Sequence, residues 1–190
     1  RLVGLAPQAT DMPVVTVDYA ATVRMLADYL WDRGHRRIAL VSGAQAVLTS
    51  RDHLRGYIAA LEARGAARDD GLVVFGDFTE RAGYEGAERL CRPGPPPEAV
   101  VCGSDTIAMG VVHYLTSRGL RVPGDVSVTG IGDIPQSLYI TPPLTTVRIP
   151  RYEMGCRAVE MIARGDDGFF GEDVIFRPKL VERGSVRDRR

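Results

Sequence analysis

Residues 38–43 read Ile38-Ala39-Leu40-Val41-Ser42-Gly43, four consecutive apolar residues followed by a hydroxyl and a glycine. A strand with one face in water alternates apolar and polar residues, whereas an unbroken apolar run predicts a strand that is buried on both faces. Comparable runs are found at Val14–Val17, Leu72–Phe75, Ala99–Cys102, Val126–Ile131 and Leu144–Ile149, and a last strand is expected near Asp173–Val181. The runs predict the strands of a parallel sheet.

Amphipathic helices are expected between these strands. After Val17, apolar residues recur at helical spacing for about 14 residues, with Asp18 as the expected N-cap and Gly34 just past the end. A second helix ends before Gly65, and further helices are expected over Thr79–Cys91, Ser104–Arg118 and Arg151–Ala163. Strands and helices that alternate in this way predict an open α/β fold with helices on both faces of the sheet.

Composition narrows the class of protein. The chain has 190 residues with 45% hydrophobic residues, and its 24 Lys and Arg balance its 24 Asp and Glu. These values are typical of a globular protein, and a neutral chain lacks the basic footprint of a nucleic-acid-binding surface. No apolar run approaches the roughly 20 residues that cross a membrane. Cysteines 91, 102 and 156 form no C-x-x-C pair, so we expect reduced thiols in the core and neither a metal nor a cofactor.

Polar residues follow four of the predicted strands. In open parallel sheets, ligands bind beyond the carboxyl ends of the strands. The residues after those ends are Ser42-Gly43-Ala44-Gln45, Gly76-Asp77-Phe78-Thr79, Gly103-Ser104-Asp105 and Gly132-Asp133. Each one taken alone is explained by turns and helix caps. Together they predict a cleft for a small polar molecule.

The sequence gives little support for an enzyme. The sequence has no G-x-S-x-G elbow, P-loop or G-x-G-x-x-G fingerprint. We expect His35 to cap the preceding helix and His113 to pack or lie at the surface. His53 opens the second helix near the strand ends, and an enzyme built on it with Asp105 or Asp133 is the least favoured hypothesis.

Several motifs resemble the lactose/galactose-repressor (LacI/GalR) family of bacterial transcription regulators. They include Gly34-His35-Arg36-Arg37-Ile38-Ala39, Ser104-Asp105-Thr106-Ile107-Ala108-Met109-Gly110, Gly119-Leu120-Arg121-Val122-Pro123-Gly124-Asp125, Pro143-Leu144-Thr145-Thr146-Val147 and Arg183-Gly184-Ser185. The resemblance covers nearly the whole chain in the family's order. It implies the two-lobed type I periplasmic-binding-protein fold, with parallel sheets flanked by helices.

The resemblance also implies how the domain is divided and what it does. Residues 1–17 and 148–170 would form an incomplete N-lobe, and residues 18–147 and 171–190 the C-lobe. Because the chain opens on Arg1-Leu2-Val3-Gly4, like the middle of a strand, we expect a fragment without the family's DNA-binding helix-turn-helix headpiece. The implied protein is a cytoplasmic regulator that binds a small effector between its lobes, contacts operator DNA through that headpiece and forms a homodimer. The alternative is a periplasmic solute-binding protein of the same fold.

Carried over residue by residue, the resemblance suggests a modified effector site. Phe78 stands where the family has an aromatic residue that stacks on the ligand, although it could instead fill the core. His53 stands in place of an arginine, Ser104 in place of an asparagine, and Gly132 in place of a ligand-binding aspartate with Asp133 beside it. The remaining candidate ligand-binding residues are Gln45 and Arg51.

These departures replace a permanent cation by an imidazole and remove a carboxylate. Our hypothesis is an effector that is not a plain monosaccharide, and the alternative is a site that has lost its effector. For the dimer, the stripe of Met154, Ala158, Met161 and Ile162 could form an interface, but packing within the lobe explains it equally well.

Overall fold

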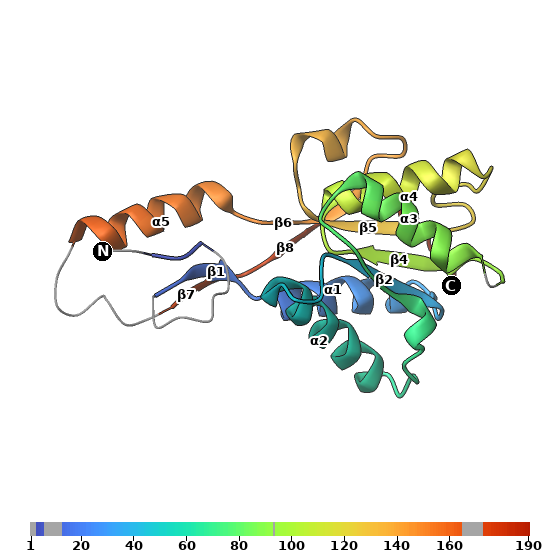
Figure 1. Ribbon diagram of the computed structural model, residues 1–190, viewed down its shortest axis with the longest axis horizontal. Coiled ribbons are helices and arrows are strands. Elements are labelled where there is room, and N and C mark those ends of the chain that lie inside the picture. Colours follow the sequence, from blue (N-terminus) through green and yellow to red (C-terminus); the bar gives the residue numbers. More distant parts are fainter. Residues whose placement is uncertain (1–2, 6–12, 93, 165–172) are drawn as a thin grey trace.

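The structure is a computed structural model that describes residues 3–5, 13–92, 94–164 and 173–190. Its helices and strands follow the order expected from the sequence, with two short 3₁₀ turns, η1 and η2 (Figure 1). In chain order they are β1 (Val15–Val17), α1 (Tyr19–Asp32), β2 (Ile38–Ser42), α2 (Leu48–Ala63), η1 (Asp70–Leu72), β3 (Val73–Phe75), α3 (Glu80–Cys91), β4 (Ala99–Cys102), α4 (Asp105–Ser117), β5 (Ser127–Gly132), η2 (Pro135–Leu138), β6 (Thr145–Arg148), α5 (Arg151–Arg164), β7 (Val174–Phe176) and β8 (Lys179–Val181).

The main sheet has six strands in the order β3-β2-β4-β5-β6-β8. All neighbouring pairs are parallel except β6 and β8, where Val147 pairs with Leu180 in antiparallel register. The expected α/β fold with a parallel sheet is therefore confirmed. The last strand closes the edge of the sheet in the opposite direction.

Helices cover both faces of this sheet, α1 and α2 on one face and α3 and α4 on the other (Figure 1). Successive residues of β2 point to opposite faces, so Ile38 and Leu40 join the core under α1 and α2, and Ala39 and Val41 the core under α3 and α4. All four are at most 1% exposed. This double burial is the physical reason for the unbroken apolar run.

The helices on each face pack backbone to backbone at glycines. A Cβ built on Gly110 of α4 would overlap the carbonyl oxygen of Glu80 in α3, and one on Gly83 of α3 would overlap that of Ile107 in α4. On the other face, Gly56 of α2 meets the carbonyl of Ala20 in α1 in the same way. Glycine is thus required at these helix crossings.

A smaller unit consists of β1 and β7, which form a two-stranded parallel sheet, together with α5 (Figure 1). The chain passes between this unit and the six-stranded sheet three times: from β1 to α1, from β6 to α5, and from β7 to β8. We assigned residues 171–190 to the same lobe as residues 18–147, and for β7 that assignment is wrong. Its backbone pairs with β1, where Thr16 faces Ile175. Residues 1–2, 6–12 and 165–172 of the expected lobes lie outside the described residues.

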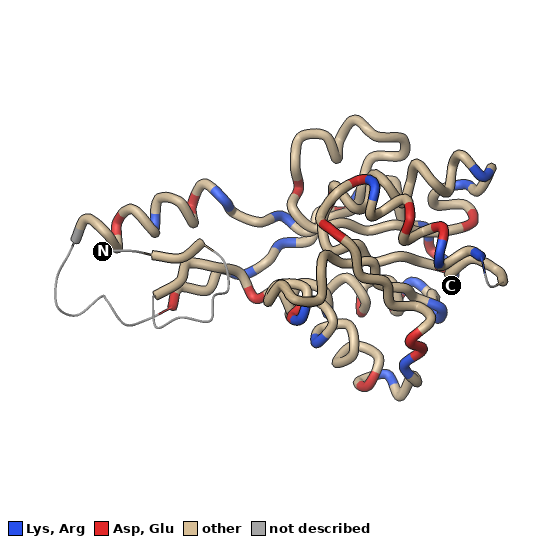
Figure 2. The backbone as a smooth tube through the Cα atoms, viewed as in Figure 1, with Lys and Arg blue, Asp and Glu red and all other residues tan. Residues whose placement is uncertain are grey.

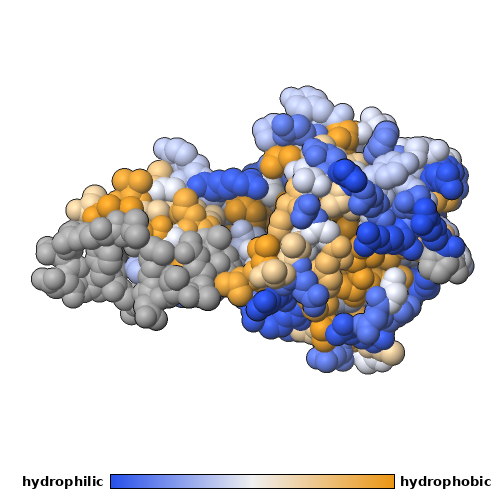
Figure 3. Space-filling view, in the orientation of Figure 1, coloured by the Kyte–Doolittle hydropathy of each residue, from blue (hydrophilic) through white to orange (hydrophobic). Residues whose placement is uncertain are grey.

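The apolar stripe on α5 is explained by packing within the chain. Met154, Ala158 and Met161 are at most 7% exposed and belong to the same core as Val15 of β1. Ile162, in contrast, is 42% exposed, and apolar side chains reach the surface of the smaller unit (Figure 3). The stripe therefore gives no separate support for a dimer.

Local capping follows the sequence expectations. The Asp18 carboxylate accepts a hydrogen bond from the Ala21 amide at 2.8 Å, and Gly34 adopts φ 88° where α1 ends. His35 is fully buried, and its Nδ1 lies 3.0 Å from the Leu30 carbonyl oxygen. Its Nε2 lies 2.8 Å from Ser127 Oγ. His35 therefore caps α1, as expected, and also ties it to β5.

Candidate functional site

The parallel strands bring the predicted site residues to one edge of the main sheet. Because β3, β2, β4 and β5 run in the same direction, their carboxyl ends meet there, followed by Phe78, Gln45, Ser104 and Asp133 in that spatial order. From β2 the chain goes to β3 on one side and then returns to β4 on the other. The strand order thus reverses between β2 and β4, the position where open α/β sheets bind ligands.

His53 lies at this reversal point. The imidazole is fully buried on the first half of α2, and its Nδ1 lies 2.9 Å from Ser42 Oγ at the end of β2. A Cβ on Gly103, just after β4, would lie 2.8 Å from the same Nδ1. The Ser42 side chain at the end of β2 and the backbone at Gly103 after β4 therefore both lie against this ring. Burial lowers the pKa of His53 to about 4, so the ring is neutral at pH 7.

Two aromatic rings contact the imidazole edge to face. The ring centroid of His53 lies 5.6 Å from that of Tyr19 and 6.4 Å from that of Phe78. Phe78 is 37% exposed, so it is not a core residue. A Cβ on Gly43 would overlap its ring, which shows that the ring lies flat against the backbone after β2. Its exposed side is available for stacking on a ligand.

Ser104 acts as a helix cap in this structure. Its Oγ accepts a hydrogen bond from the Ile107 amide at 3.1 Å, which is the alternative that the sequence left open. The adjacent Asp105 is 1% exposed and accepts hydrogen bonds from Thr146 Oγ1 and from the Ile134 amide. Burial raises the pKa of Asp105, although both hydrogen bonds oppose that shift. Asp105 thus links the segments that follow β4 and β5 to Thr146 within β6.

Gly132 and Asp133 end β5 in a strained turn with φ of 138° and 52°. The Gly132 carbonyl accepts a hydrogen bond from Arg151 Nη1 at 2.7 Å. Asp133 forms ion pairs with Arg148 and Arg183, one through each carboxylate oxygen. Burial acts to raise the pKa of Asp133, but the two guanidinium groups outweigh it and hold the pKa below its usual range. Both oxygens are engaged, so a ligand would have to compete with these ion pairs.

Gln45 and Arg51 lie next to each other beyond the carboxyl end of β2. Arg51 Nε donates a hydrogen bond to the Gln45 carbonyl oxygen at 3.1 Å, and both residues line a hollow of about 430 Å³ with Ala46 and Leu54. The structure thus brings the predicted residues to one edge. Their role in binding a ligand stays a prediction.

Sequence reasoning missed three side chains at this edge. Tyr19 follows the Asp18 cap, and burial raises its pKa while the charge of Arg151 opposes the shift. Ser42 was recognised as the hydroxyl residue that follows Val41 at the end of its strand, but it was not selected as a candidate ligand-binding residue. The position of Arg151 three residues after the end of β6, where α5 begins, was the available signal for that residue.

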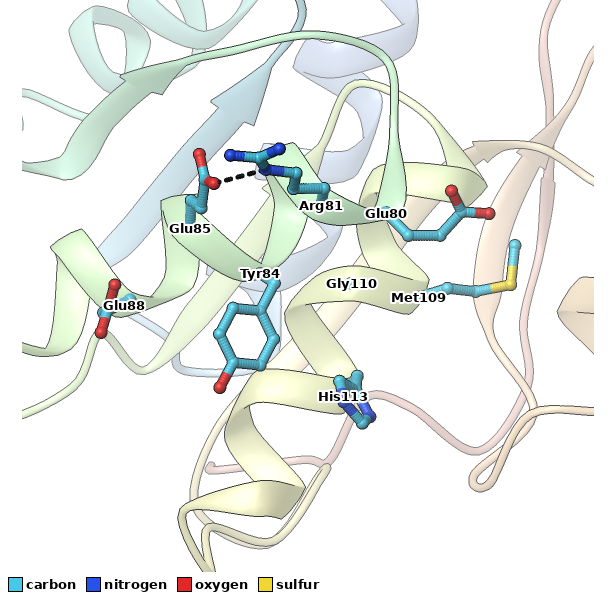
Figure 4. Close-up of a pocket in the computed structure, with 8 residues that line it drawn as sticks. All are labelled: Glu80, Arg81, Tyr84, Glu85, Glu88, Met109, Gly110 and His113. Atoms are coloured by element: carbon cyan, nitrogen blue, oxygen red, sulfur yellow. Dashed lines mark hydrogen bonds and ion pairs between the residues drawn. The ribbon is translucent and has the colours of Figure 1, made fainter.

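A larger hollow of about 640 Å³ lies elsewhere, on the outer side of α3 and α4 (Figure 4). Tyr84 and His113 line its floor with ring centroids 5.6 Å apart, and Arg81 is paired with Glu85 at its rim. It is separate from the strand ends. His113 packs on the surface of this hollow, as the sequence indicated.

Charge is distributed evenly over the described chain, where Lys and Arg alternate with Asp and Glu without a continuous basic stripe (Figure 2). Within the described ranges, no group of three or more His, Cys, Asp and Glu side chains is arranged to hold a metal ion. None of the helices in that part of the chain has the length and apolar character needed to cross a membrane.

Acid is expected to destabilise the fold through His53. Its pKa falls from 6.5 to about 4 on folding, so between these pH values the unfolded state binds a proton that the folded state does not. The free energy of unfolding is therefore unaffected by His53 above pH 6.5 and decreases as the pH falls towards 4. We expect a loss of about 2 kcal/mol in the free energy of unfolding between pH 7 and pH 5 from this residue. Urea unfolding of the wild type and of His53→Gln at both pH values measures it, with His113→Gln as the control. Equal pH dependence of wild type and His53→Gln would contradict this expectation.

Comparison with known sequences identifies the family. Residues 27–186 match the family described as "Periplasmic binding protein-like domain". The chain is 33% identical over 182 residues to the HTH-type transcriptional repressor CytR of Escherichia coli (strain K12), and 34% identical over 165 residues to the HTH-type transcriptional repressor PurR of Proteus mirabilis (strain HI4320). These matches cover 93% and 84% of this chain but 52% and 48% of the relatives, so the chain spans about half their length.

Solved structures agree with this result. A sugar-binding transcriptional regulator of the LacI family from Escherichia coli, complexed with phosphate, superimposes with a TM-score of 0.86 and 31% identity, over 98% of this chain and 67% of that one. The CelR–cellobiose complex, also of a transcriptional regulator, gives a TM-score of 0.85 and 30% identity over 96% and 57% of the two chains. The chain belongs to the LacI family and contains its periplasmic binding protein-like domain.

Proposed function

We propose that this chain is the effector-sensing part of a bacterial transcriptional regulator that acts in the cytoplasm and binds operator DNA through a separate headpiece. The observation that carries the proposal is the edge between β2 and β4, where a buried imidazole lies beside the half-exposed ring of Phe78. A polar group next to an apolar face is the usual composition of a small-molecule site. The repressor names of the relatives support the same function.

In the proposed mechanism, the effector changes the position of the smaller unit relative to the main sheet. Tyr19 is the first residue of α1, which follows the connection from β1, and Arg151 is the first residue of α5, which follows the connection from β6. Arg151 also donates a hydrogen bond to the end of β5. A ligand that binds at this edge in one arrangement of the two units but not in the other shifts their equilibrium by the difference in its affinities. The edge would bind its ligand without chemical change to it.

A solute-binding protein of the same fold is the second candidate. It would use the same edge to carry a nutrient rather than to control DNA binding. The names of both relatives favour the regulator over this alternative. We further propose that the complete regulator is a homodimer, because paired headpieces read the two halves of a palindromic operator. Sedimentation velocity of the full-length protein measures that assembly.

Titration calorimetry tests the effector site with D-glucose, D-galactose, D-ribose, adenosine and cytidine. We expect one of the nucleosides or another ligand with fewer hydroxyl groups to bind better than an unmodified hexose. Phe78→Ala is expected to weaken the best ligand about tenfold through the loss of aromatic stacking, and Phe78→Tyr to retain it. Tight binding of a plain hexose would contradict the ligand class, and equal affinity of Phe78→Ala would contradict the site.

The regulatory part of the proposal needs the full-length protein and its own promoter DNA. Fluorescence anisotropy of that DNA is expected to change when the best ligand is added. A ligand that binds but leaves the DNA affinity unchanged would favour the solute-binding alternative.

A further inference from the structure

Two buried polar atoms on α2 have no hydrogen-bond partner among the described residues, namely Ser50 Oγ and His53 Nε2. Both residues are 0% exposed. They are three positions apart and therefore lie on the same face of the helix. Leaving a buried donor or acceptor unpaired costs about 1–3 kcal/mol. Most buried side-chain polar groups in folded proteins have a partner, so these two atoms are candidates for contact with a molecule other than the chain itself.

The neighbouring serine determines which nitrogen of the neutral imidazole carries the proton. The only hydrogen bond of the Ser42 hydroxyl within the described part of the chain is the one of 2.9 Å with His53 Nδ1. Ser42 is itself 0% exposed, so its proton is donated to Nδ1 or is left without an acceptor. Donation makes Nδ1 the acceptor and places the ring proton on Nε2. The unpaired atom is therefore a hydrogen-bond donor.

The surroundings show what kind of group could accept this bond. Burial keeps the imidazole neutral, and within the described residues no carboxylate or guanidinium group is paired with it. A single neutral donor does not compensate for burying an ionised group beside it. The adjacent rings of Tyr19 and Phe78 are apolar surfaces that suit a flat or apolar ligand face. An uncharged acceptor atom next to such a face fits all of these contacts.

We propose that His53 determines the effector class by donating a hydrogen bond from Nε2 to an uncharged oxygen or ring nitrogen of a ligand that stacks on Phe78. This inference rests on the proposed effector site and specifies its ligand. A hydroxyl, a carbonyl or an unprotonated ring nitrogen meets the requirement. A carboxylate or phosphate at this position does not. Ser50 Oγ, on the same face of α2, is likewise without a partner among the described residues.

Nitrogen-15 NMR of the histidine rings tests the first half of the proposal without any ligand. The chain has three histidines, and the spectrum of His53→Gln identifies the signals that belong to residue 53. We expect a neutral His53 with its proton on Nε2 at pH 7. A proton on Nδ1, or a charged ring, would overturn the proposal, because the unpaired nitrogen would then be an acceptor or an imidazolium.

Binding to two variants of the full-length protein tests the second half. His53→Gln keeps a side-chain donor, whereas His53→Leu has a similar volume and none. With adenosine and D-ribose as probes, we expect the better ligand to bind His53→Gln within a few fold of wild type and His53→Leu about 10- to 100-fold more weakly. Circular dichroism and thermal unfolding of both variants verify that they are folded.

Ligand analogues locate the hydrogen bond. Adenosine is compared with its 1-deaza, 3-deaza and 7-deaza forms and with 2′-deoxyadenosine, and ribose with its deoxy forms. Removal of the correct acceptor should weaken binding to wild type but not to His53→Leu. If every analogue loses the same factor in both proteins, or if His53→Leu binds as tightly as wild type, the inference fails and a bound water is the partner of Nε2. Failure of wild type to bind any probe would instead contradict the effector function, and the NMR result would still decide the tautomer.

Discussion

Replacing Gly110 by alanine is expected to lower the free energy of unfolding by about 3 kcal/mol. The added methyl group would overlap the carbonyl oxygen of Glu80 and would lie 2.8 Å from the backbone nitrogen of Tyr84. Both atoms belong to the backbone of α3, so no side chain can rotate away to make room. The two helices would have to separate, which would expose the core that they cover between them.

Gly155→Ala is the matched control because Gly155 is also a helical glycine. Apart from its chain neighbours and the nearby backbone of α5 itself, no described atom lies within 4 Å of the position of its Cβ, and alanine favours a helix over glycine. We expect Gly155→Ala to raise the free energy of unfolding by about 0.5–1 kcal/mol. Urea unfolding followed by circular dichroism measures both variants. Similar changes in the two would show that helix propensity, and not the contact of α3 with α4, governs this site.

Replacing Arg183 by methionine is expected to destabilise the fold by a similar amount, about 3 kcal/mol. Arg183 and Asp133 are 11% and 8% exposed at their side chains, so removal of the cation leaves a nearly buried carboxylate with only Arg148. The same guanidinium also donates to Ser137 Oγ and to the Leu144 carbonyl oxygen, at 3.0 and 2.9 Å. Methionine fills the space but restores none of these bonds.

Arg92→Met tests whether the effect depends on burial. Arg92 pairs with Glu88 at 3.0 Å, but the two side chains are 71% and 37% exposed, and we expect a change below about 0.5 kcal/mol. The pH dependence gives a second criterion. Because the pKa of Asp133 is held low in the folded state, its stabilisation is present above its unfolded pKa of about 3.9 and disappears at lower pH. The difference between wild type and Arg183→Met should therefore shrink below pH 4, and a constant difference would contradict the ion-pair explanation.

The sequence was informative wherever one physical rule decides the structure. Burial on both faces requires unbroken apolar strands, and this predicted β2, β4 and the parallel sheet. Capping rules predicted Asp18 and Gly34, and the rule for strand ends predicted that Phe78, Gln45 and Ser104 would share an edge. The family resemblance then agreed with residues that had already been selected for physical reasons.

Other features depend on tertiary contacts that no local pattern reveals. The single strand expected near 173–181 is divided into β7 and β8, which pair with different sheets. The α5 stripe was ambiguous because a buried face and an interface have the same periodicity. The burial of His53 depends on Gly103, which is distant in sequence, and the ion pairs of Asp133 depend on Arg183, which is 50 residues away.

The three passages of the chain between β1 and α1, β6 and α5, and β7 and β8 restrict how the two units can move. A single tether would permit rotation and twisting in any direction. Three connections are expected to resist twisting of one unit against the other more than one connection would, so we expect bending between the units to be the easiest motion. Under the proposed function, the response to a bound effector would then follow this one bending motion, which a DNA-binding headpiece would sense as two arrangements of the units.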